Sequence, residues 1–286
     1  MTLLGELLDE LAVELAGPGV PPARAVARDL IAGVMDQPRF WPTAHQDDIL
    51  DAATHAAIRE AAARLRQGMP LQYAVGKASF RHLTLQVDQR VLIPRPETEL
   101  LVELVLTAQG GKSGVVVDVG TGSGAIALAL AAEGSFERVH ATEISAAALE
   151  VARQNLAAIP KSRQGLVQFH EGDLLAPIAG TLVDTVVSNP PYISESEASE
   201  LPQLVREWEP AVALFAGEDG MAVIARLVPQ SAALLTPGGL LAMEVDTRRA
   251  DRAAQVVGGD GRFVDVEIRP DLTGRPRFLV ARRKER

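Results

Sequence analysis

The chain has 286 residues, a net charge of -9 at pH 7, 47% hydrophobic residues and no cysteine. This length predicts one main domain with a smaller one attached. The lack of cysteine excludes disulfides, thiolate nucleophiles and thiolate-ligated metal centres. The acidic balance argues against sequence-independent binding of nucleic acid, which needs lysine and arginine to neutralise phosphates.

No apolar run reaches about 18 residues, the length that a transmembrane helix needs. The first ten residues, M-T-L-L-G-E-L-L-D-E, lack the basic start of a signal peptide. We therefore expect a cytoplasmic protein without a membrane partner. The histidines lack the spacing of metal ligands, so no metal site is expected; they are His45, His55, His82, His140 and His170.

The N-terminal quarter carries leucine and alanine at the three- and four-residue spacing of amphipathic helices. This spacing predicts a small helical bundle with helices over residues 3–15, 23–35 and 49–65. Prolines and a glycine break the pattern between these helices; they are Gly17, Pro18, Pro21, Pro22, Pro38 and Pro42.

Beyond Gly76 the pattern changes to alternating apolar and polar residues. The alternation runs from Ser79 to Val87, passes through the polar turn at residues 88–90 and resumes at residues 91–93. It predicts a β-hairpin that links the helical bundle to the rest of the chain.

From residue 95 onward, predicted strands alternate with predicted helices. The strands are residues 115–119, 138–142, 166–169, 183–187 and 240–245, and the helices are 97–108, 125–132, 221–235 and two that begin at 145 and 248. This alternation predicts an α/β fold with a mostly parallel, Rossmann-like sheet and right-handed crossovers. Two closing strands, 263–268 and 277–281, predict an antiparallel hairpin at one edge.

A glycine-rich loop over residues 118–124, D-V-G-T-G-S-G, lies between a predicted strand and a helix. Doubly wound sheets bind ligands at such turns, where glycine lets the backbone approach closely. The spacing G-x-G-x-G differs from the G-x-G-x-x-G that seats a pyrophosphate. It suits a cofactor without phosphates, because Asp118 would repel a diphosphate but attract an ammonium group. The alternative is a tight turn that binds no ligand.

Acidic residues also follow the next two predicted strands. Glu143 lies 25 positions beyond Asp118, where a carboxylate can accept hydrogen bonds from both ribose hydroxyls. Asp173 could accept from an adenine amino group while Leu174 covers the ring. Each acid alone could be a solvated loop residue, but the ends of consecutive parallel strands meet at one edge of a sheet.

This arrangement resembles the class I S-adenosylmethionine-dependent methyltransferases over about residues 95–286. The resemblance implies that S-adenosyl-L-methionine is the cofactor and S-adenosyl-L-homocysteine the product. It also implies that the glycine loop lies beside the methionine moiety and that Glu143 holds the ribose. The predicted cofactor-binding residues are Asp118, Gly120, Thr121, Gly122, Ser123, Gly124, Glu143, Asp173, Leu174 and Asn189.

The segment S-N-P-P-Y-I, residues 188–193, follows the predicted strand 183–187. A planar amide nitrogen is a poor nucleophile, so a site that methylates it should hold its NH2 hydrogens with acceptors and fix its plane. Asn189 offers a side-chain oxygen and Pro190 a carbonyl, the two prolines restrict the backbone, and Tyr192 offers a stacking face. The alternative is a proline-rich stop after a buried strand. The tetrapeptide resembles the N/D-P-P-Y/F motif of methyltransferases that act on adenine, cytosine, guanine or glutamine.

Three further stretches look like the HemK/PrmC family of peptide chain release factor glutamine methyltransferases. They are G-M-P-L-Q-Y at 68–73, I-P-R-P-E-T-E at 93–99 and D-L-T-G-R-P-R at 271–277, and the match covers nearly the whole chain. The resemblance implies methylation of the glutamine amide in the Gly-Gly-Gln tripeptide of bacterial release factors. One segment departs from the family pattern, because Glu244-Val245-Asp246-Thr247 stands where many members have Glu-x-Gly or Glu-His.

The resemblance also implies roles for the segments and side chains. Because a separate helical region stands beside a complete catalytic domain, residues 1–75 are expected to bind the release factor, 76–94 to link the domains and 95–286 to catalyse methyl transfer. The predicted catalytic residues are Asn189, Pro190 and Tyr192, and the predicted substrate-binding residues are Asn189, Pro190, Pro191, Tyr192 and Arg95. A surface salt bridge or a helix start is an equal alternative for Arg95.

Other functions remain open at this point. A glutamine methyltransferase that acts on a ribosomal protein would share all of this chemistry. A DNA or RNA amino-methyltransferase predicts a basic cleft and more stacking aromatics, whereas this chain is acidic and 4% aromatic. A third alternative is a non-enzymatic protein in which the helical region is an adaptor and the α/β part senses the cofactor.

Overall fold

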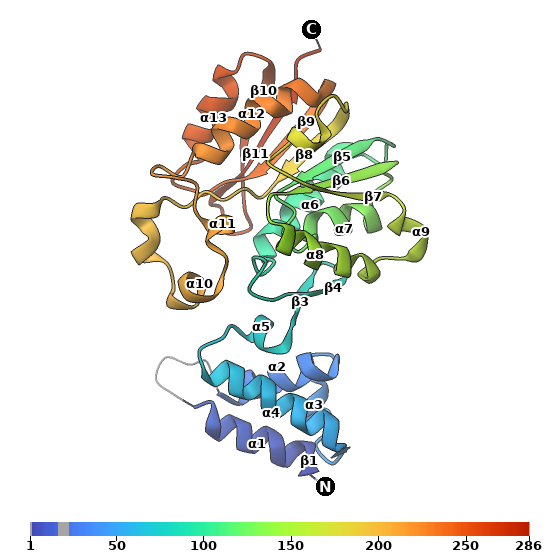
Figure 1. The fold of residues 1–286 in the computed structure, drawn as a ribbon, viewed down its shortest axis with the longest axis vertical. Helices are drawn as coiled ribbons and strands as arrows, with labels where there is room; N and C mark the ends of the chain where they lie inside the picture. Colours follow the sequence, from blue (N-terminus) through green and yellow to red (C-terminus); the bar gives the residue numbers. More distant parts are fainter. Residues whose placement is uncertain (1, 17–22, 286) are drawn as a thin grey trace. The chain divides into compact units, whose positions relative to one another are not determined.

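The computed structural model describes residues 2–16 and 23–285. The chain divides into two compact units, Met1–Lys77 and Ala78–Arg286 (Figure 1). The helix-breaking residues Gly17, Pro18, Pro21 and Pro22 lie outside the described residues.

The first unit is a helical bundle, as predicted. Its described helices are α1 (Leu4–Glu14), α2 (Ala23–Met35), α3 (Trp41–Ala44), α4 (Ala52–Arg66) and α5 (Leu71–Val75). Leucines at helical spacing in α1 pack with Leu30 and Ile31 of α2 and Ile58 of α4. Full burial of each such side chain contributes about 1.5–3 kcal/mol, so this apolar stripe holds the bundle together.

The fourth helix begins three residues later than the sequence pattern predicts. Asp51 caps it by accepting a hydrogen bond from the backbone N–H of Thr54 at 2.9 Å. The two residues before the cap form β2 (Ile49–Leu50), which pairs antiparallel with β1 (Thr2–Leu3). The cap therefore separates a short strand from the helix within one apolar stretch.

A hairpin opens the second unit, but the predicted position of its turn is wrong. The strands are β3 (Lys77–Phe80) and β4 (Leu83–Gln86), and residues 91–93 form no strand. The chain turns at Arg81, whose φ is 52°. Contacts from distant residues fix this left-handed turn, because the Arg81 backbone N–H donates to Glu99 at 3.0 Å and its guanidinium binds Glu133.

A seven-stranded sheet forms the centre of the second unit, in the order β10-β11-β9-β8-β5-β6-β7. The strands are β5 (Val115–Val119), β6 (Arg138–Glu143), β7 (Val167–Glu171), β8 (Val183–Ser188), β9 (Leu235–Glu244), β10 (Phe263–Pro270) and β11 (Pro276–Arg283). The strands from β5 to β9 pair in parallel, and β11 pairs antiparallel with both β9 and β10. The predicted mostly parallel sheet with an antiparallel edge hairpin is confirmed.

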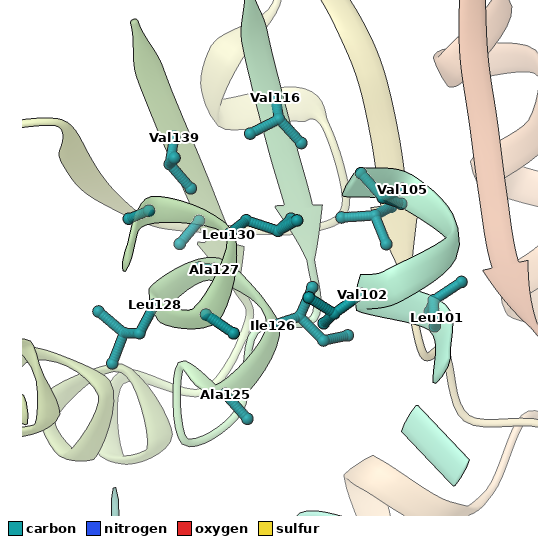
Figure 2. Close-up of a cluster of buried hydrophobic side chains, with 14 of the residues drawn as sticks. Leu101, Val102, Val105, Val116, Ala125, Ile126, Ala127, Leu128, Leu130 and Val139 are labelled. Carbon is teal, nitrogen blue, oxygen red and sulfur yellow. The ribbon is translucent and has the colours of Figure 1, made fainter. Parts of the chain in front are cut away.

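Helices cover both faces of this sheet. One buried cluster includes side chains of α6 (Pro96–Gln109) and α7 (Ala125–Glu133), and the other includes α12 (Ala222–Leu234) and α13 (Ala250–Gly259). Figure 2 shows side chains of α7 between those of α6 and the strands β5 and β6. Helix α7 is apolar on nearly every side, and its residues 125–131 are all buried. The glycine loop that precedes α7 is therefore attached to the most buried helix of the unit.

The remaining helical segments connect these elements. They are α8 (Ala146–Asn155), η1 (Leu156–Ala158), α9 (Lys161–Gln164), η2 (Ala176–Ile178), η3 (Glu195–Glu200), α10 (Gln203–Trp208) and α11 (Ala211–Leu214). Sequence reasoning assigned no structure to the stretch that holds η3, α10 and α11. A parallel bridge between Ile193 and Phe215 closes this stretch into a loop.

Candidate functional site

Four loops meet at the carboxyl ends of the parallel strands. Val119 at the end of β5 lies opposite Thr142 of β6 and Ser188 of β8, and Glu143 of β6 lies opposite Glu171 of β7. This register places the loops that begin at residues 120, 144, 172 and 189 beside one another, as expected for the carboxyl ends of parallel strands.

A pocket of about 230 Å³ lies among these loops, and we call it the glycine pocket. Its wall includes Gly120 and Gly122 of the glycine loop, Glu143 after β6, and Asp173 and Leu174 after β7. Asn189 and Pro191 complete the wall on the β8 side. The structure thus brings most of the residues that the strand ends predicted into one cavity.

The glycine loop needs glycine for conformation and for space. Gly120 and Gly122 have φ of 73° and 55°, backbone angles that residues other than glycine rarely adopt. The backbone N–H groups of Gly120 and Thr121 donate to the carbonyl of Thr142 at 2.9 and 3.0 Å, which ties the loop to the end of β6. A Cβ at Gly120 or Gly122 would meet no atom within 4 Å. These two glycines therefore leave open space at the pocket wall.

Asp118 lies beneath the loop and is fully buried. Its Oδ2 accepts from the Thr121 hydroxyl at 2.6 Å and from the Ala127 backbone N–H at 3.1 Å, so it joins the loop to α7. Its Oδ1 has no hydrogen-bond partner among the described residues. Burial raises the pKa of Asp118 to about 7, and these two hydrogen bonds oppose the rise.

The other predicted residues of the loop also lie behind its surface. Thr121 and Ser123 are buried, and a Cβ at Gly124 would lie 3.1 Å from the side chain of Leu128. Asp118, Thr121, Ser123 and Gly124 do not line the glycine pocket. The structure gives them contacts that hold the loop, and a direct contact with a cofactor stays a prediction for each.

Glu143 is buried at the pocket wall with its carboxylate held at both oxygens. Oε2 accepts from the Gly122 backbone N–H at 2.9 Å, and Oε1 accepts from the Ser145 backbone N–H at 3.0 Å. Ser145 in turn caps α8 through the Ala148 backbone N–H at 3.2 Å. Each carboxylate oxygen has a second lone pair, so Glu143 can still accept hydrogen bonds from a ligand.

Asp173 and Leu174 form the far side of the glycine pocket. Asp173 pairs with Arg226 of α12, a pocket residue that sequence reasoning missed. Leu174 has a φ of 50°, and the next backbone N–H, of Leu175, donates to the side chain of Gln230 at 3.0 Å. A left-handed leucine is costly and persists only where its surroundings hold it, a situation that is common at ligand sites.

A second pocket of about 190 Å³ adjoins the first, and we call it the tyrosine pocket. All of the predicted substrate-binding residues line it, namely Arg95, Asn189, Pro190, Pro191 and Tyr192. Asn189 and Pro191 line the glycine pocket as well, so they form a wall between the two cavities. Asn189 is thus accessible from both cavities.

Asn189 and Tyr192 are fixed by buried neighbours. Asn189 Nδ2 donates to the Thr98 hydroxyl at 3.1 Å, and its Oδ1 has no hydrogen-bond partner among the described residues. Burial and the nearby negative charge of Glu244 raise the pKa of Tyr192 well above its usual range, so its hydroxyl keeps its proton. The wall between the pockets therefore presents an amide oxygen, and the tyrosine stays neutral.

Arg95 is both the residue before α6 and half of an ion pair. It pairs with Glu209, whose side chain is 2% exposed, while the Arg95 side chain is 34% exposed. The Glu209 partner lies in the loop after β8, and sequence reasoning missed it. The pair ties the I-P-R-P-E-T-E stretch to that loop at the tyrosine pocket. Arg95 precedes the helix start as considered, but its salt bridge is not the surface pair that was the alternative, because its partner Glu209 is buried.

Two further searches cover the part of the chain that the structure describes. No group of three or more His, Asp or Glu side chains is placed to hold a metal ion there. No helix in it has the length and apolar character to cross a membrane.

Comparison with known proteins gives the family. Residues 96–207 match the model of the methyltransferase small domain, and residues 6–76 match that of the PrmC N-terminal domain. A release factor glutamine methyltransferase of Mycolicibacterium smegmatis is 42% identical over 283 residues, which is 99% of this chain and 99% of that one. The chain belongs to the release factor glutamine methyltransferase family.

Other members of the family are similar to the chain over nearly its full length. Release factor glutamine methyltransferases of Moorella thermoacetica and Deinococcus radiodurans are each 38% identical to the chain. The alignments cover 99% of both chains for the first and 98% of both chains for the second. The family and the matched methyltransferase domain make this protein an S-adenosylmethionine-dependent methyltransferase by class.

Solved structures support the fold. A methyltransferase of Pyrococcus furiosus has a TM-score of 0.54 and 19% identity, over 77% of this chain and 98% of that one. The hMettl16 catalytic domain, solved with an RNA hairpin, has a TM-score of 0.56 and 14% identity, over 82% of this chain and 83% of that one. At these identities the likeness shows the methyltransferase fold alone.

Proposed function

We propose that the protein transfers a methyl group from S-adenosyl-L-methionine to a glutamine side chain of bacterial peptide chain release factors. The accepting atom is the side-chain amide nitrogen in the Gly-Gly-Gln motif. The observation that carries this proposal is the pair of adjoining pockets with Asn189 and Pro191 in their shared wall. Full-length similarity to relatives named release factor glutamine methyltransferase supports the choice of substrate.

The glycine pocket fits the cofactor. Gly120 and Gly122 leave the space that the methionine moiety needs, because no atom lies within 4 Å of a Cβ at either position. Glu143 would accept hydrogen bonds from the ribose hydroxyls with the lone pairs that Gly122 and Ser145 leave free. Asp173 and Leu174 would hold the adenine. The bound cofactor supplies an electrophilic methyl group on a sulfonium and leaves as S-adenosyl-L-homocysteine.

Asp118 would act from beneath the loop. Its unpaired Oδ1 and its position behind residues 120–122 suit attraction of the ammonium group of the cofactor. The hydrogen bonds of Asp118 to Thr121 and Ala127 keep the loop in its left-handed shape at the same time. Thr121, Ser123 and Gly124 would contribute by holding this shape.

The tyrosine pocket would hold the glutamine amide for in-line attack. Asn189 Oδ1 and the carbonyl of Pro190 would accept its two N–H hydrogens, and Tyr192 would pack against its plane. The restricted backbone of the two prolines aims these acceptors before the substrate binds. Orientation of this kind can lower a barrier by about 7 kcal/mol or more in favourable cases. The methylated nitrogen is acidic, so it can release its proton to a carbonyl or water without a strong base.

The helical unit would bind the body of the release factor. Residues 1–75 are the proposed release-factor-binding domain, and residues 76–94 would link it to the catalytic domain at 95–286. Phe40 of this unit is 65% exposed, and the guanidinium of Arg39, whose side chain is 63% exposed, lies 5.9 Å from the centre of its ring. Exposed aromatic and arginine side chains are the types that most often dominate protein interfaces.

Methylation of a purified release factor tests the proposed reaction. The protein is incubated with S-adenosyl-L-methionine carrying a labelled methyl group and with a release factor, and the modified residue is mapped by mass spectrometry. We expect one methyl group on the glutamine of Gly-Gly-Gln. A label on another residue, or no label on the release factor when ribosomal proteins tested in a parallel reaction are methylated, would contradict the proposal.

Substitution of Phe40 by serine tests the role of the helical unit. The KM for the whole release factor should rise about tenfold, while the KM for a short Gly-Gly-Gln peptide should stay the same. Leu182→Ser is the matched control. Leu182 is 63% exposed and lies just before the start of β8, at the opposite end of the strand from the site. An equal change for both substrates in Phe40→Ser would show that the unit only stabilises the fold.

A further inference from the structure

A buried hydrogen-bond chain reaches Asn189 from two distant parts of the sequence. Thr98 Oγ1 donates to Glu244 Oε2 at 2.7 Å and accepts from Asn189 Nδ2 at 3.1 Å. Thr98 lies in the first turn of α6 and is 5% exposed, and Glu244 ends β9 and is 2% exposed. Because β8 and β9 are parallel neighbours with Ser188 opposite Met243, Asn189 and Glu244 leave the sheet side by side.

The chemistry of a hydroxyl gives this chain a direction. A threonine hydroxyl has one proton to donate, and an ionised carboxylate can only accept. Once Thr98 donates to Glu244, its oxygen can only accept from Asn189, so the NH2 group of the amide must face Thr98. The amide oxygen, Oδ1, is then the atom left free at the pocket wall.

Without this chain, the amide would have two orientations of nearly equal shape. A hydroxyl whose proton is not taken by Glu244 can donate to Asn189 Oδ1, which turns the amide over. The side chain would then present NH2 to the pocket, and an NH2 group cannot accept a hydrogen bond from a substrate amide. The direction of one buried hydrogen bond therefore decides whether the site has its acceptor.

The surroundings of Glu244 act on its charge in both directions, and the hydrogen bond that it accepts from Thr98 is the contact that gives the chain its direction. Burial raises its pKa, while hydrogen bonds from Thr98 and Tyr192 and the positive charge of Arg277 counter the rise. Glu97, the residue before Thr98 in the first turn of α6, adds a repulsive negative charge. Hydrogen-bond donors on α6 and in the loop after β8, together with the positive charge of Arg277 on β11, thus act on one buried carboxylate.

We propose that Thr98 and Glu244 are positioning residues that hold the Asn189 amide with Oδ1 toward the tyrosine pocket. This inference rests on the proposed function, in which Oδ1 accepts a hydrogen bond from the glutamine NH2. It gives a role to Thr98 of the I-P-R-P-E-T-E stretch and to Glu244 of the E-V-D-T segment. The same arrangement disfavours glutamate as a ligand, because a carboxylate would face the lone pairs of Oδ1.

Substitution of Thr98 in the full-length protein tests this role. In Thr98→Val, kcat with a purified release factor should fall about ten- to hundredfold, and the KM for S-adenosyl-L-methionine should stay within about twofold. Thr98→Ser restores the hydroxyl and should recover kcat to within about threefold of wild type. In Glu244→Gln the new amide can donate as well as accept, so this variant should lower kcat and leave the KM for the cofactor unchanged. It tests the same role if Thr98→Val does not fold.

A second buried threonine provides the matched control. Thr185 of β8 is fully buried, and its hydroxyl has no partner among the described residues. Thr185→Val should therefore keep the wild-type kcat, although it makes the same chemical change as Thr98→Val.

A ligand comparison separates positioning from general damage. A Gly-Gly-Glu peptide should inhibit Thr98→Val at least about fivefold more strongly, relative to its KM for the glutamine substrate, than it inhibits wild type. Wild-type kcat in a folded Thr98→Val, or equal losses of activity in Thr98→Val and Thr185→Val, would overturn the positioning role. If the wild-type protein itself does not methylate the release factor, the proposed function is wrong, and the inference falls with it.

Discussion

Glu143 offers a direct test of the glycine pocket through the substitution Glu143→Gln. The carboxylate accepts from the Gly122 backbone N–H at 2.9 Å and from the Ser145 backbone N–H at 3.0 Å. Glutamine has nearly the same shape but only one accepting oxygen, so its NH2 group must face one of these two donors. The variant therefore loses the charge that would bind the ribose and leaves one backbone donor without an acceptor.

The size of the expected effect follows from these contacts. A hydrogen bond to a charged group is worth about 1.5–3 kcal/mol, so the Kd for S-adenosyl-L-methionine should rise roughly 10- to 150-fold. The Kd for S-adenosyl-L-homocysteine should rise by the same factor, because the ribose is common to both. The unpaired backbone donor should lower the free energy of unfolding by about 1–3 kcal/mol.

Isothermal titration calorimetry of the folded variant measures both affinities. Glu171→Gln is the matched control, because Glu171 ends the neighbouring strand β7, is exposed and does not line the pocket. It should bind the cofactor as wild type does. An unchanged Kd in Glu143→Gln, or an equal rise in both variants, would refute the assignment of Glu143 to the cofactor.

Two further predictions concern the glycine loop and a buried histidine pair. Gly120→Ala places a methyl group in the pocket at a φ of 73° and should weaken cofactor binding; Gly110→Ala, at a φ of 58° after α6, carries similar strain and should leave the Kd unchanged in the same titration. Burial, with the charges of His170 and Arg138, lowers the pKa of His140 to about 4. The unfolded chain binds this proton near pH 6.5, so the unfolded state holds more protons between pH 6.5 and 4 and stability falls as the pH decreases through that range. Urea unfolding at both ends of the range should show wild type losing about 2–3 kcal/mol more than His140→Gln; equal losses would show that His140 does not cause the pH dependence.

The fold of the second unit follows from its sequence because its elements are locally determined. The central strands β5 and β8 are mostly apolar runs, and Gly120 follows the first while the polar Ser188 ends the second. The turn at Arg81 could not be predicted in this way, because Glu99 and Glu133 stabilise it from α6 and α7. The alternating pattern continues through the turn and gives no local sign of it.

The loop after β8 shows a second limit of sequence reasoning. Its segments η3, α10 and α11 are short, and contacts such as the pair Arg95–Glu209 hold them in place. Short helices have weak local signals, since isolated helices of fewer than about 12 residues are marginal in water. Glu209 is buried, but nothing in the surrounding sequence distinguishes it from an exposed glutamate such as Glu207.

The residues of the site also include some that the sequence could reveal and others that it could not. Asn189 and Glu143 could be found because each follows a predicted strand within a recognisable motif. Arg226 could not, since it reaches Asp173 from a helix far along the chain. Thr98 and Glu244 are separated by 146 positions, and only their hydrogen bond shows that they act on the same side chain.

The most direct test of the proposed site is the substitution Asn189→Ala. It removes the acceptor in the wall between the two pockets and leaves the glycine loop and Glu143 in place. The Kd for S-adenosyl-L-methionine should stay within roughly tenfold of wild type, about 1.4 kcal/mol, while methyl transfer to the release factor should be abolished. Turnover at the wild-type rate in Asn189→Ala would contradict the account, because the glutamine amide would then need no acceptor at this position.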